Sequence, residues 1–267
     1  MSQPERMRLA RIGGLEVCST QAGSGQHFEK HSHDEFVISA NLLGEEQVWL
    51  DGRTFSAGAG AITTYNPGEI QGGGARAGQP WRYVSLYVPP DELAASLGLA
   101  QLQFAAPLQQ QPLLANALAQ AVEQCLSDDA LLRERGEESV TLLLGDIARG
   151  AGVRAAGSAD MGRGPVARLQ ELLAAHLEQT PSLEQMAASV GLSKFHLLRA
   201  FKQRTGLSPR QWAMQLRTRR ARGLLRLGLP VGEVAHALGF ADQSHLTRYF
   251  RAAYGLPPGQ FQRAVRR

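Results

Sequence analysis

The C-terminal part of the chain contains an internal repeat, which constrains its fold more than any other feature of the sequence. The stretch "GLSKFHLLRAFKQRTG" at 191–206 returns as "GFADQSHLTRYFRAAYG" at 239–255. Each copy predicts a short helix with a small residue inside it, a glycine turn, and a second helix with two buried residues at i and i+4. The matched pairs are Ala187 with Ala235, Gly191 with Gly239, Leu197 with Leu246, and Phe201 with Phe250. We therefore expect two helix-turn-helix units, at 182–204 and 231–254.

One long helix is predicted between the two units, over 209–227. Ser208 is suited to cap it and Pro209 to occupy its first position. A helix of this length spans about 28 Å at 1.5 Å per residue. Such a rigid connection lets one chain read two neighbouring turns of the DNA major groove, which lie ~34 Å apart.

The second helix of each unit carries side chains suited to DNA outside its buried pair. Arg pairs with guanine, Gln pairs with adenine, and apolar groups contact the thymine methyl. Lys202 and Arg251 lie further along their helices and suit phosphates. A solvated helix face is the alternative for any single residue, but Arg199 and Arg248 occupy matching places in the two copies. The candidate DNA-binding residues are Lys194, Phe195, Leu198, Arg199 and Lys202 in the first unit, and Gln243, Ser244, His245, Thr247, Arg248 and Arg251 in the second.

Charge divides the chain at about the same place as the repeat. Residues 1–162 hold 11 Lys/Arg and 19 Asp/Glu, a net charge of −8, whereas residues 163–267 hold 17 and 5, a net charge of +12. A basic end on an acidic body indicates that the end meets a polyanion. A basic face without a partner is the alternative, because charge alone specifies association and not fold.

The N-terminal part predicts a different architecture. Short β-rich runs separated by Gly, Asn and Pro predict a small barrel or sandwich over 10–90, and two helical patterns follow within 110–150. A Gly- and Ala-rich stretch at 151–164 is expected to be a linker. The predicted fold class is α+β with two domains: an N-terminal cupin-like β-barrel followed by two helices (1–150), and an all-α DNA-binding domain (165–267).

The sequence argues against several locations and site types. It has no apolar run of about 18 residues and no apolar segment near its start, so neither a membrane helix nor a secretory leader is expected. Cys18 and Cys125 lie far apart, outside any C-x-x-C spacing, so no disulfide framework is indicated. We expect a cytoplasmic protein that does not bind membranes.

The C-terminal part resembles the AraC/XylS family of bacterial transcription regulators. The resemblance covers about 165–267 and rests on "SLEQMAASVGLS", "LLRAFKQRTGLSP", "RARGLL" and "EVAHALGFADQSHLTRYFRAAYGLPPGQF". It implies two helix-turn-helix units joined by a long helix. Ala213 and Thr218 stand where the family usually has larger apolar residues, and His245 stands where an aromatic residue is common. These departures concern packing more than function.

The N-terminal part resembles the cupin-like sensor domain of the same family, through Gly25, "HSH" at 31–33 and "NPGEIQ" at 66–71. The metal ligands of a cupin would be two histidines, a glutamate and a later histidine. His31 and His33 are present, but Val37 or Ile38 stands at the glutamate position and Gln71 at the last. Two imidazoles and an amide make a poor metal site. We expect no metal, no other cofactor and no catalytic residue; Glu35 and Glu69 lie outside the motif positions.

The barrel is instead expected to hold a small molecule. His31, His33 and Gln71 would supply hydrogen bonds, and a purely structural role for the histidines is the alternative. Five further residues could line the pocket or belong to the core: Trp49, Tyr65, Trp81, Arg82 and Tyr83. The candidate ligand-binding residues are His31, His33, Trp49, Tyr65, Gln71 and Arg82.

Taken with the resemblance, these features predict a sequence-specific transcription regulator, an activator that responds to a small molecule. The resemblance implies double-stranded DNA, RNA polymerase and a small-molecule effector as partners, and a homodimer formed through the helices at 110–150. One alternative is a cupin metalloenzyme fused to a DNA-binding domain. The other is a ligand-free regulator controlled by a protein partner.

Overall fold

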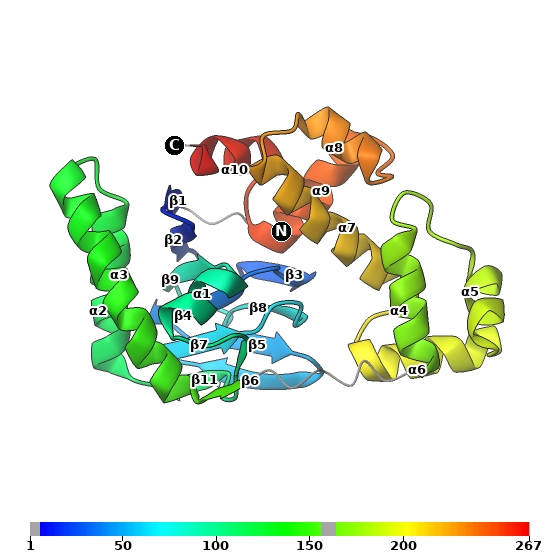
Figure 1. Cartoon of the computed structure of the whole chain (residues 1–267), viewed down its shortest axis with the longest axis horizontal. Coiled ribbons are helices and arrows are strands. Elements are labelled where there is room, and N and C mark those ends of the chain that lie inside the picture. The colour runs from blue at the N-terminus through cyan, green and yellow to red at the C-terminus, as the bar shows by residue number, and fades with distance from the viewer. Residues whose placement is uncertain (1–5, 156–163, 267) are drawn as a thin grey trace.

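The computed structural model describes residues 6–155 and 164–266 and shows a β-rich N-terminal domain followed by a helical C-terminal domain (Figure 1). The predicted two-domain α+β fold class is confirmed. No helix among the described residues has the length and hydropathy needed to cross a membrane.

Two antiparallel sheets form the N-terminal barrel. The first has the strand order β1-β2-β9-β4-β7-β11 and the second the order β3-β8-β5-β6. The first strand begins at Arg6, ahead of the predicted start at residue 10. The strands are β1 Arg6–Ile12, β2 Leu15–Ala22, β3 His27–His31, β4 Phe36–Leu43, β5 Glu46–Leu50, β6 Arg53–Ala57, β7 Ala61–Tyr65, β8 Gln71–Ala75, β9 Trp81–Val88 and β11 Leu108–Gln110.

Three helices cover the outer face of the six-stranded sheet: α1 (Pro90–Ser96), α2 (Pro112–Cys125) and α3 (Ala130–Ala151). Alternation along β9 shows how the sheet separates two environments. Val84, Leu86 and Val88 belong to the apolar core shared with α2 and α3, whereas the residues between them face the barrel interior. Asp129 caps α3 by accepting from two backbone amides.

The predicted linker begins with regular structure. Val153–Ala155 forms strand β12, which pairs antiparallel with β10 (Leu102–Phe104), so the first residues of the predicted linker belong to a small sheet. Val153 packs against the N-terminal core, and this apolar contact selects the strand. The rest of the predicted linker, 156–163, lies outside the described residues.

The C-terminal domain contains seven helices among its described residues. The long helix α7 begins at Pro209, with Ser208 and Gln211 forming a capping box, and lies between the two helix-turn-helix units (Figure 1). The helices are α4 Pro165–Ala175, α5 Leu183–Val190, α6 Lys194–Thr205, α7 Pro209–Arg226, α8 Val231–Ala237, α9 Gln243–Tyr254 and α10 Pro258–Val265.

The two domains are in direct contact. Helices α7, α9 and α10 lie over the N-terminal edge of the barrel, at β1 and β3 (Figure 1). Met7 and Leu9 of β1 pack against the apolar core of the second helix-turn-helix unit. The first unit has its own core and lies beside the barrel (Figure 1), which it meets at the end of α6, where Lys30 Nζ donates to the backbone oxygen of Gly206 at 3.4 Å.

Candidate functional site

Each helix-turn-helix unit is built by the residues that the repeat predicted. Ala187 and Ala235 are buried where the two helices of a unit approach each other. The glycines at the turns, Gly191 and Gly239, have φ angles of 71° and 68°, a conformation that glycine adopts without strain. A side chain at Gly239 would also lie 2.1 Å from a backbone oxygen of Glu178. The turn at Gly239 therefore admits only glycine.

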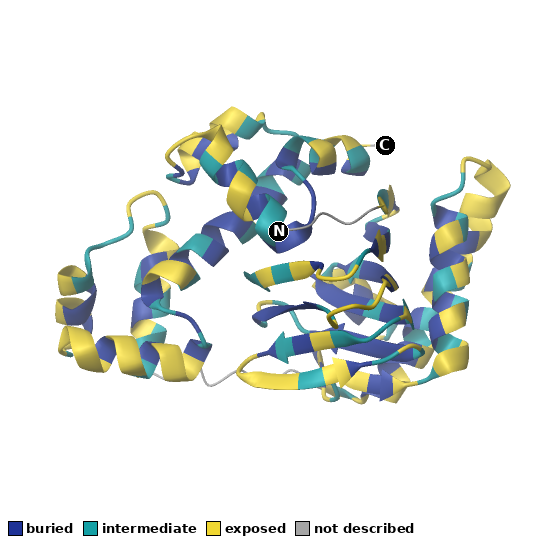
Figure 2. Cartoon of the chain, turned by 180° about the vertical axis from the view of Figure 1, so that it is seen from behind, coloured by how far each residue is buried: buried dark blue, intermediate teal, exposed yellow. Residues whose placement is uncertain are grey.

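The second helices α6 and α9 begin at side-chain caps. Ser193 accepts from the amide of His196, and Asp242 accepts from the amide of His245. Leu197 and Phe201 in α6, and their counterparts in α9, are fully buried. The opposite faces of these helices are therefore presented outward, as the exposed side of α6 shows (Figure 2).

Most of the predicted DNA-binding residues lie on these outward faces. Lys194, Phe195, Leu198, Arg199 and Lys202 are exposed on α6, as are Gln243, Ser244 and Arg248 on α9, while His245, Thr247 and Arg251 are half-buried. His245 Nδ1 accepts from the amide of Ala241, and its ring contacts Phe240 and Tyr249. His245 thus supports the turn as well as the surface. Tyr249, exposed beside Arg248, was not anticipated from the sequence.

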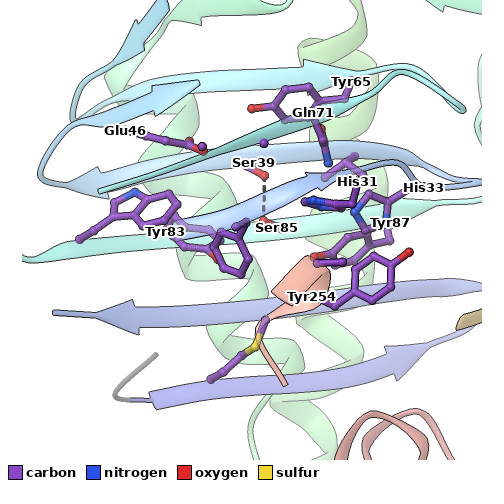
Figure 3. A pocket seen from close by; sticks show the side chains of 17 residues that line it. His31, His33, Ser39, Glu46, Tyr65, Gln71, Tyr83, Ser85, Tyr87 and Tyr254 are labelled. Atoms are coloured by element: carbon purple, nitrogen blue, oxygen red, sulfur yellow. Dashed lines mark hydrogen bonds between the residues drawn. The ribbon is translucent and has the colours of Figure 1, made fainter. Parts of the chain in front are cut away.

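A cavity lies between the two sheets of the barrel. It has a volume of about 70 Å³ open to the centres of water molecules. Four of the predicted ligand-binding residues line it: His31, His33, Tyr65 and Gln71. Figure 3 shows their side chains together with Ser39, Ser85 and further tyrosines around one space.

Two predicted ligand-binding residues lie elsewhere, because strand alternation turns them outward. On β9, Trp81 and Tyr83 line the cavity, and Arg82 between them is exposed. On β5, Glu46 lines the cavity, whereas Trp49 lies in a groove between the domains, with Lys30 Nζ 3.4 Å from its ring centre. Arg82 and Trp49 are therefore corrected: neither borders the barrel cavity.

Burial keeps the two histidines neutral. It lowers the pKa of His31 to about 4, and it also lowers the pKa of His33, which nearby arginines lower further. His31 Nδ1 lies 2.7 Å from the backbone oxygen of Glu29, while His33 Nδ1 is buried without a hydrogen-bond partner in the described structure. The ring of His33 therefore keeps one nitrogen for a ligand.

The alternative metal ligands have other partners. Glu35 pairs with two arginines of the C-terminal domain, and Glu69 accepts hydrogen bonds from Asn66. Groups of three or more His, Cys, Asp or Glu side chains placed to hold a metal ion do not occur among the described residues. The imidazoles here are suited to hydrogen bonding.

One wall of the cavity comes from the C-terminal domain. Tyr254, the last residue of helix α9, lines the cavity beside His31 and His33 (Figure 3), with ring centres 5.4 and 5.3 Å away. Its hydroxyl donates to the backbone oxygen of Ser32 at 3.3 Å. The helix predicted to read DNA thus also closes the barrel.

A buried ion-pair cluster holds the domains together next to this wall. Arg222 of α7 donates to Glu16 and Glu35 at 2.5 and 2.7 Å, and Arg226 pairs with the same two carboxylates. Burial alone would raise the pKa of Glu35, but the two guanidinium groups outweigh it and hold this pKa at about 2. Glu35 therefore remains ionised at neutral pH.

A groove runs between the barrel and the C-terminal domain near the same interface. It is bordered by Lys30 and Trp49 on the barrel side and by Lys202, Arg210 and Arg248 on the other side. Two of the predicted DNA-binding residues therefore face the N-terminal domain in this arrangement.

Comparison with known proteins identifies both halves of the chain. Residues 13–144 match a family described as AraC-like ligand binding domain, and residues 186–264 match one described as Helix-turn-helix domain. The chain is 26% identical over 231 residues to YbfI of Bacillus subtilis, an uncharacterized HTH-type transcriptional regulator, covering 84% of this chain and 83% of YbfI. It is 37% identical over 100 residues to the HTH-type transcriptional activator RhaS of Escherichia fergusonii, which is 36% of each protein.

The whole fold also has a counterpart among solved structures. ToxT of Vibrio cholerae, crystallised with a bound unsaturated fatty acid, superimposes with a TM-score of 0.55 over 99% of this chain and 98% of ToxT. The identity is 11%, so the likeness concerns the fold alone.

Proposed function

Because the chain belongs to the AraC family of transcriptional regulators, with an AraC-like ligand-binding domain and a helix-turn-helix domain, we propose that a small molecule in the barrel controls its binding to DNA. The observation that carries this proposal is the position of Tyr254. It ends the helix α9 and at the same time forms a wall of the cavity. A ligand in the cavity therefore contacts the DNA-binding domain directly.

The docked arrangement competes with DNA in this proposal. Lys202 and Arg248 lie on the groove that faces the barrel, and a DNA duplex needs the same side chains. A ligand shifts the balance between docked and undocked states only by its difference in affinity for the two. By reciprocity, the factor by which the ligand changes the protein's affinity for DNA equals the factor by which DNA changes the protein's affinity for the ligand.

The proposal includes a homodimer that acts as an activator by recruiting RNA polymerase, as the family resemblance implies. Leu131 and Leu142, both on α3, are 67% and 77% exposed. They lie eleven residues apart, which is close to three helical turns and places them on one face. Exposed leucines repeated on one helix face suit a contact with a second copy of the chain.

The separated C-terminal domain is expected to bind DNA more tightly than the full chain. A fragment of residues 163–267 keeps both helix-turn-helix cores and a net charge of +12. It has no barrel to dock on, so docking no longer competes with DNA. Its affinity for DNA should fall steeply as salt increases, because bound counterions are released. Fluorescence anisotropy on both proteins at several salt concentrations measures this. Equal affinities would refute the competition, and a folded fragment without DNA binding would refute the DNA assignment.

Arg199→Ala and Arg248→Ala are each expected to weaken binding to the specific site by about 1–3 kcal/mol. Each should also relax the sequence preference at one base position, and these positions should lie about one helical turn apart. Lys202→Ala is the matched comparison: loss of a phosphate contact weakens all sequences alike and lowers the salt slope by about one unit. Binding-site selection on the wild type and the variants measures the preferences. If both arginine variants keep the full preference, these arginines contact only the backbone.

A further inference from the structure

A carboxylate points into the barrel without a partner. On β5, Glu46 lies in phase with the inward residues Val48 and Leu50, and its side chain borders the cavity (Figure 3). The side chain of Glu46 has no hydrogen bond or ion pair with another described residue, whereas the side chain of its neighbour Glu45 pairs with Arg76 outside the barrel. An unpaired carboxylate in such a place destabilises the fold, and groups of this kind gather at functional sites.

The lining of the cavity is aromatic and carries no opposing cation. Lysine and arginine are absent from its described lining residues. Trp81 and Tyr83 pack against each other with ring centres 4.3 Å apart, and Trp81 is fixed by a hydrogen bond from its indole nitrogen to Asn41. Tyr65, Tyr87 and Tyr254 complete the walls. A carboxylate among several aromatic faces is the chemistry that binds organic ammonium ions.

The other end of the cavity offers unused hydrogen-bonding atoms. His33 Nδ1 and Gln71 Oε1 are buried and have no partner in the described structure. Buried polar atoms usually have a partner, from the protein or from a bound molecule. A ligand with a hydroxyl or amide group at this end would satisfy them. The cavity volume is only about 70 Å³, so the ligand is small.

We propose that the cavity binds a small organic ammonium ion, with its cationic head against Glu46 and the Trp81–Tyr83 pair and a hydrogen-bonding group toward His33 and Gln71. Only the statement that this ion is the effector rests on the proposed function; the binding itself does not. A carboxylate ligand is disfavoured when Glu46 is ionised, because two anions would then share the cavity. The guanidinium of Arg222 lies 4.7 Å from the ring centre of Tyr87, but it is paired with Glu16 and Glu35.

Binding of such a cation is linked to the loss of a proton from Glu46. Burial raises the pKa of Glu46 to about 8, so at neutral pH the empty cavity holds mostly the protonated acid. The other titratable groups on the cavity are His31 and His33, whose pKa values are lowered, and Tyr65, Tyr83, Tyr87 and Tyr254, whose pKa values are raised by burial. Glu46 is therefore the cavity group that titrates between pH 6 and 9. Since a cation prefers the ionised form, its affinity should rise by up to about tenfold per pH unit below pH 8 and level off above it.

The test measures binding to the full chain by calorimetry at pH 8.5. The probes are choline, ethanolamine and tetramethylammonium, with 3,3-dimethylbutan-1-ol as the uncharged isostere of choline and 3,3-dimethylbutanoate as an anion. Choline is expected to bind about tenfold or more tightly than its isostere. Glu46→Gln should remove that preference and leave the binding of the alcohol unchanged. Glu45→Gln, the same substitution one residue away outside the barrel, should leave both unchanged.

Several results would overturn the proposal: none of the three ammonium ions binds, the alcohol or the anion binds as tightly as choline, or Glu46→Gln keeps the preference. The pH profile of the wild type gives an independent readout, and a flat profile for choline between pH 6 and 8 also contradicts it. DNA affinity is measured with and without choline. Choline binding that leaves DNA affinity unchanged refutes the regulatory function alone, whereas intact DNA binding without ammonium binding refutes the ligand class alone.

Discussion

Arg222→Ala is expected to destabilise the docked chain by about 3–5 kcal/mol, because it leaves Glu16 and Glu35 buried with one cation fewer. The side chains of Arg222 and Glu16 are 6% and 3% exposed, so water cannot replace the lost partner while the domains stay docked. The domains can instead separate, which returns both carboxylates to water. We therefore expect two results together: a lower or divided unfolding transition in urea, and tighter DNA binding by the full chain.

The matched control lies at the same interface. Arg219 pairs with Asp34 at 3.2 Å, but the Asp34 side chain is 57% exposed. Asp34→Asn should cost about 0–1 kcal/mol, as usual for exposed ion pairs, and leave DNA affinity unchanged. Two results would contradict this expectation: Arg222→Ala is no more destabilising than Asp34→Asn, or it destabilises the chain without increasing DNA affinity at any urea concentration. In either case, the cluster does not hold the domains in a docked state that competes with DNA.

Gln215→Pro is expected to cost about 3 kcal/mol or more and to abolish recognition of the two-part DNA site. Gln215 lies in the middle of α7, which connects the two helix-turn-helix units. A proline there removes one helical hydrogen bond and its ring clashes with the preceding turn. The two recognition helices then lose their fixed spacing, while each unit keeps its own apolar core.

Gln215→Ala is the control that distinguishes the effect of breaking the helix from the effect of losing the side chain. The side-chain amide of Gln215 donates to the hydroxyl of Ser32 in the barrel. Alanine removes this interdomain hydrogen bond while favouring the helix. The alanine variant should therefore keep two-site DNA binding, as measured by footprinting on a site with both halves. Two-site protection that survives in Gln215→Pro would show that α7 does not set the spacing.

The helix-turn-helix pair could be predicted from the sequence because its determinants are local. The glycines of the two turns, the caps Ser193 and Asp242, and the apolar pairs at i and i+4 all lie within one supersecondary unit. Such patterns specify structure without knowledge of distant contacts. The barrel strands were likewise predicted by their β-rich runs and turn residues.

The ligand cavity was predicted in part, and the errors have one cause. His31, His33, Tyr65 and Gln71 border the cavity, but Trp49 and Arg82 were chosen by residue type without regard to alternation. Each lies between two inward residues of its strand, so it faces outward. The same alternation, with Glu46 in phase with Val48 and Leu50, was a signal that could have identified the inward carboxylate.

The contacts between the domains were decided by the tertiary structure alone. Glu16 and Arg222 are separated by 206 positions, and Tyr254 reaches Ser32 across 222. No periodicity or motif links such residues, because their proximity depends on how two finished domains dock. The sequence therefore determined which helices could read DNA and that the barrel is suited to a ligand. Only the docking of α7 and α9 on the barrel placed a residue of a helix that is predicted to read DNA in the wall of the cavity.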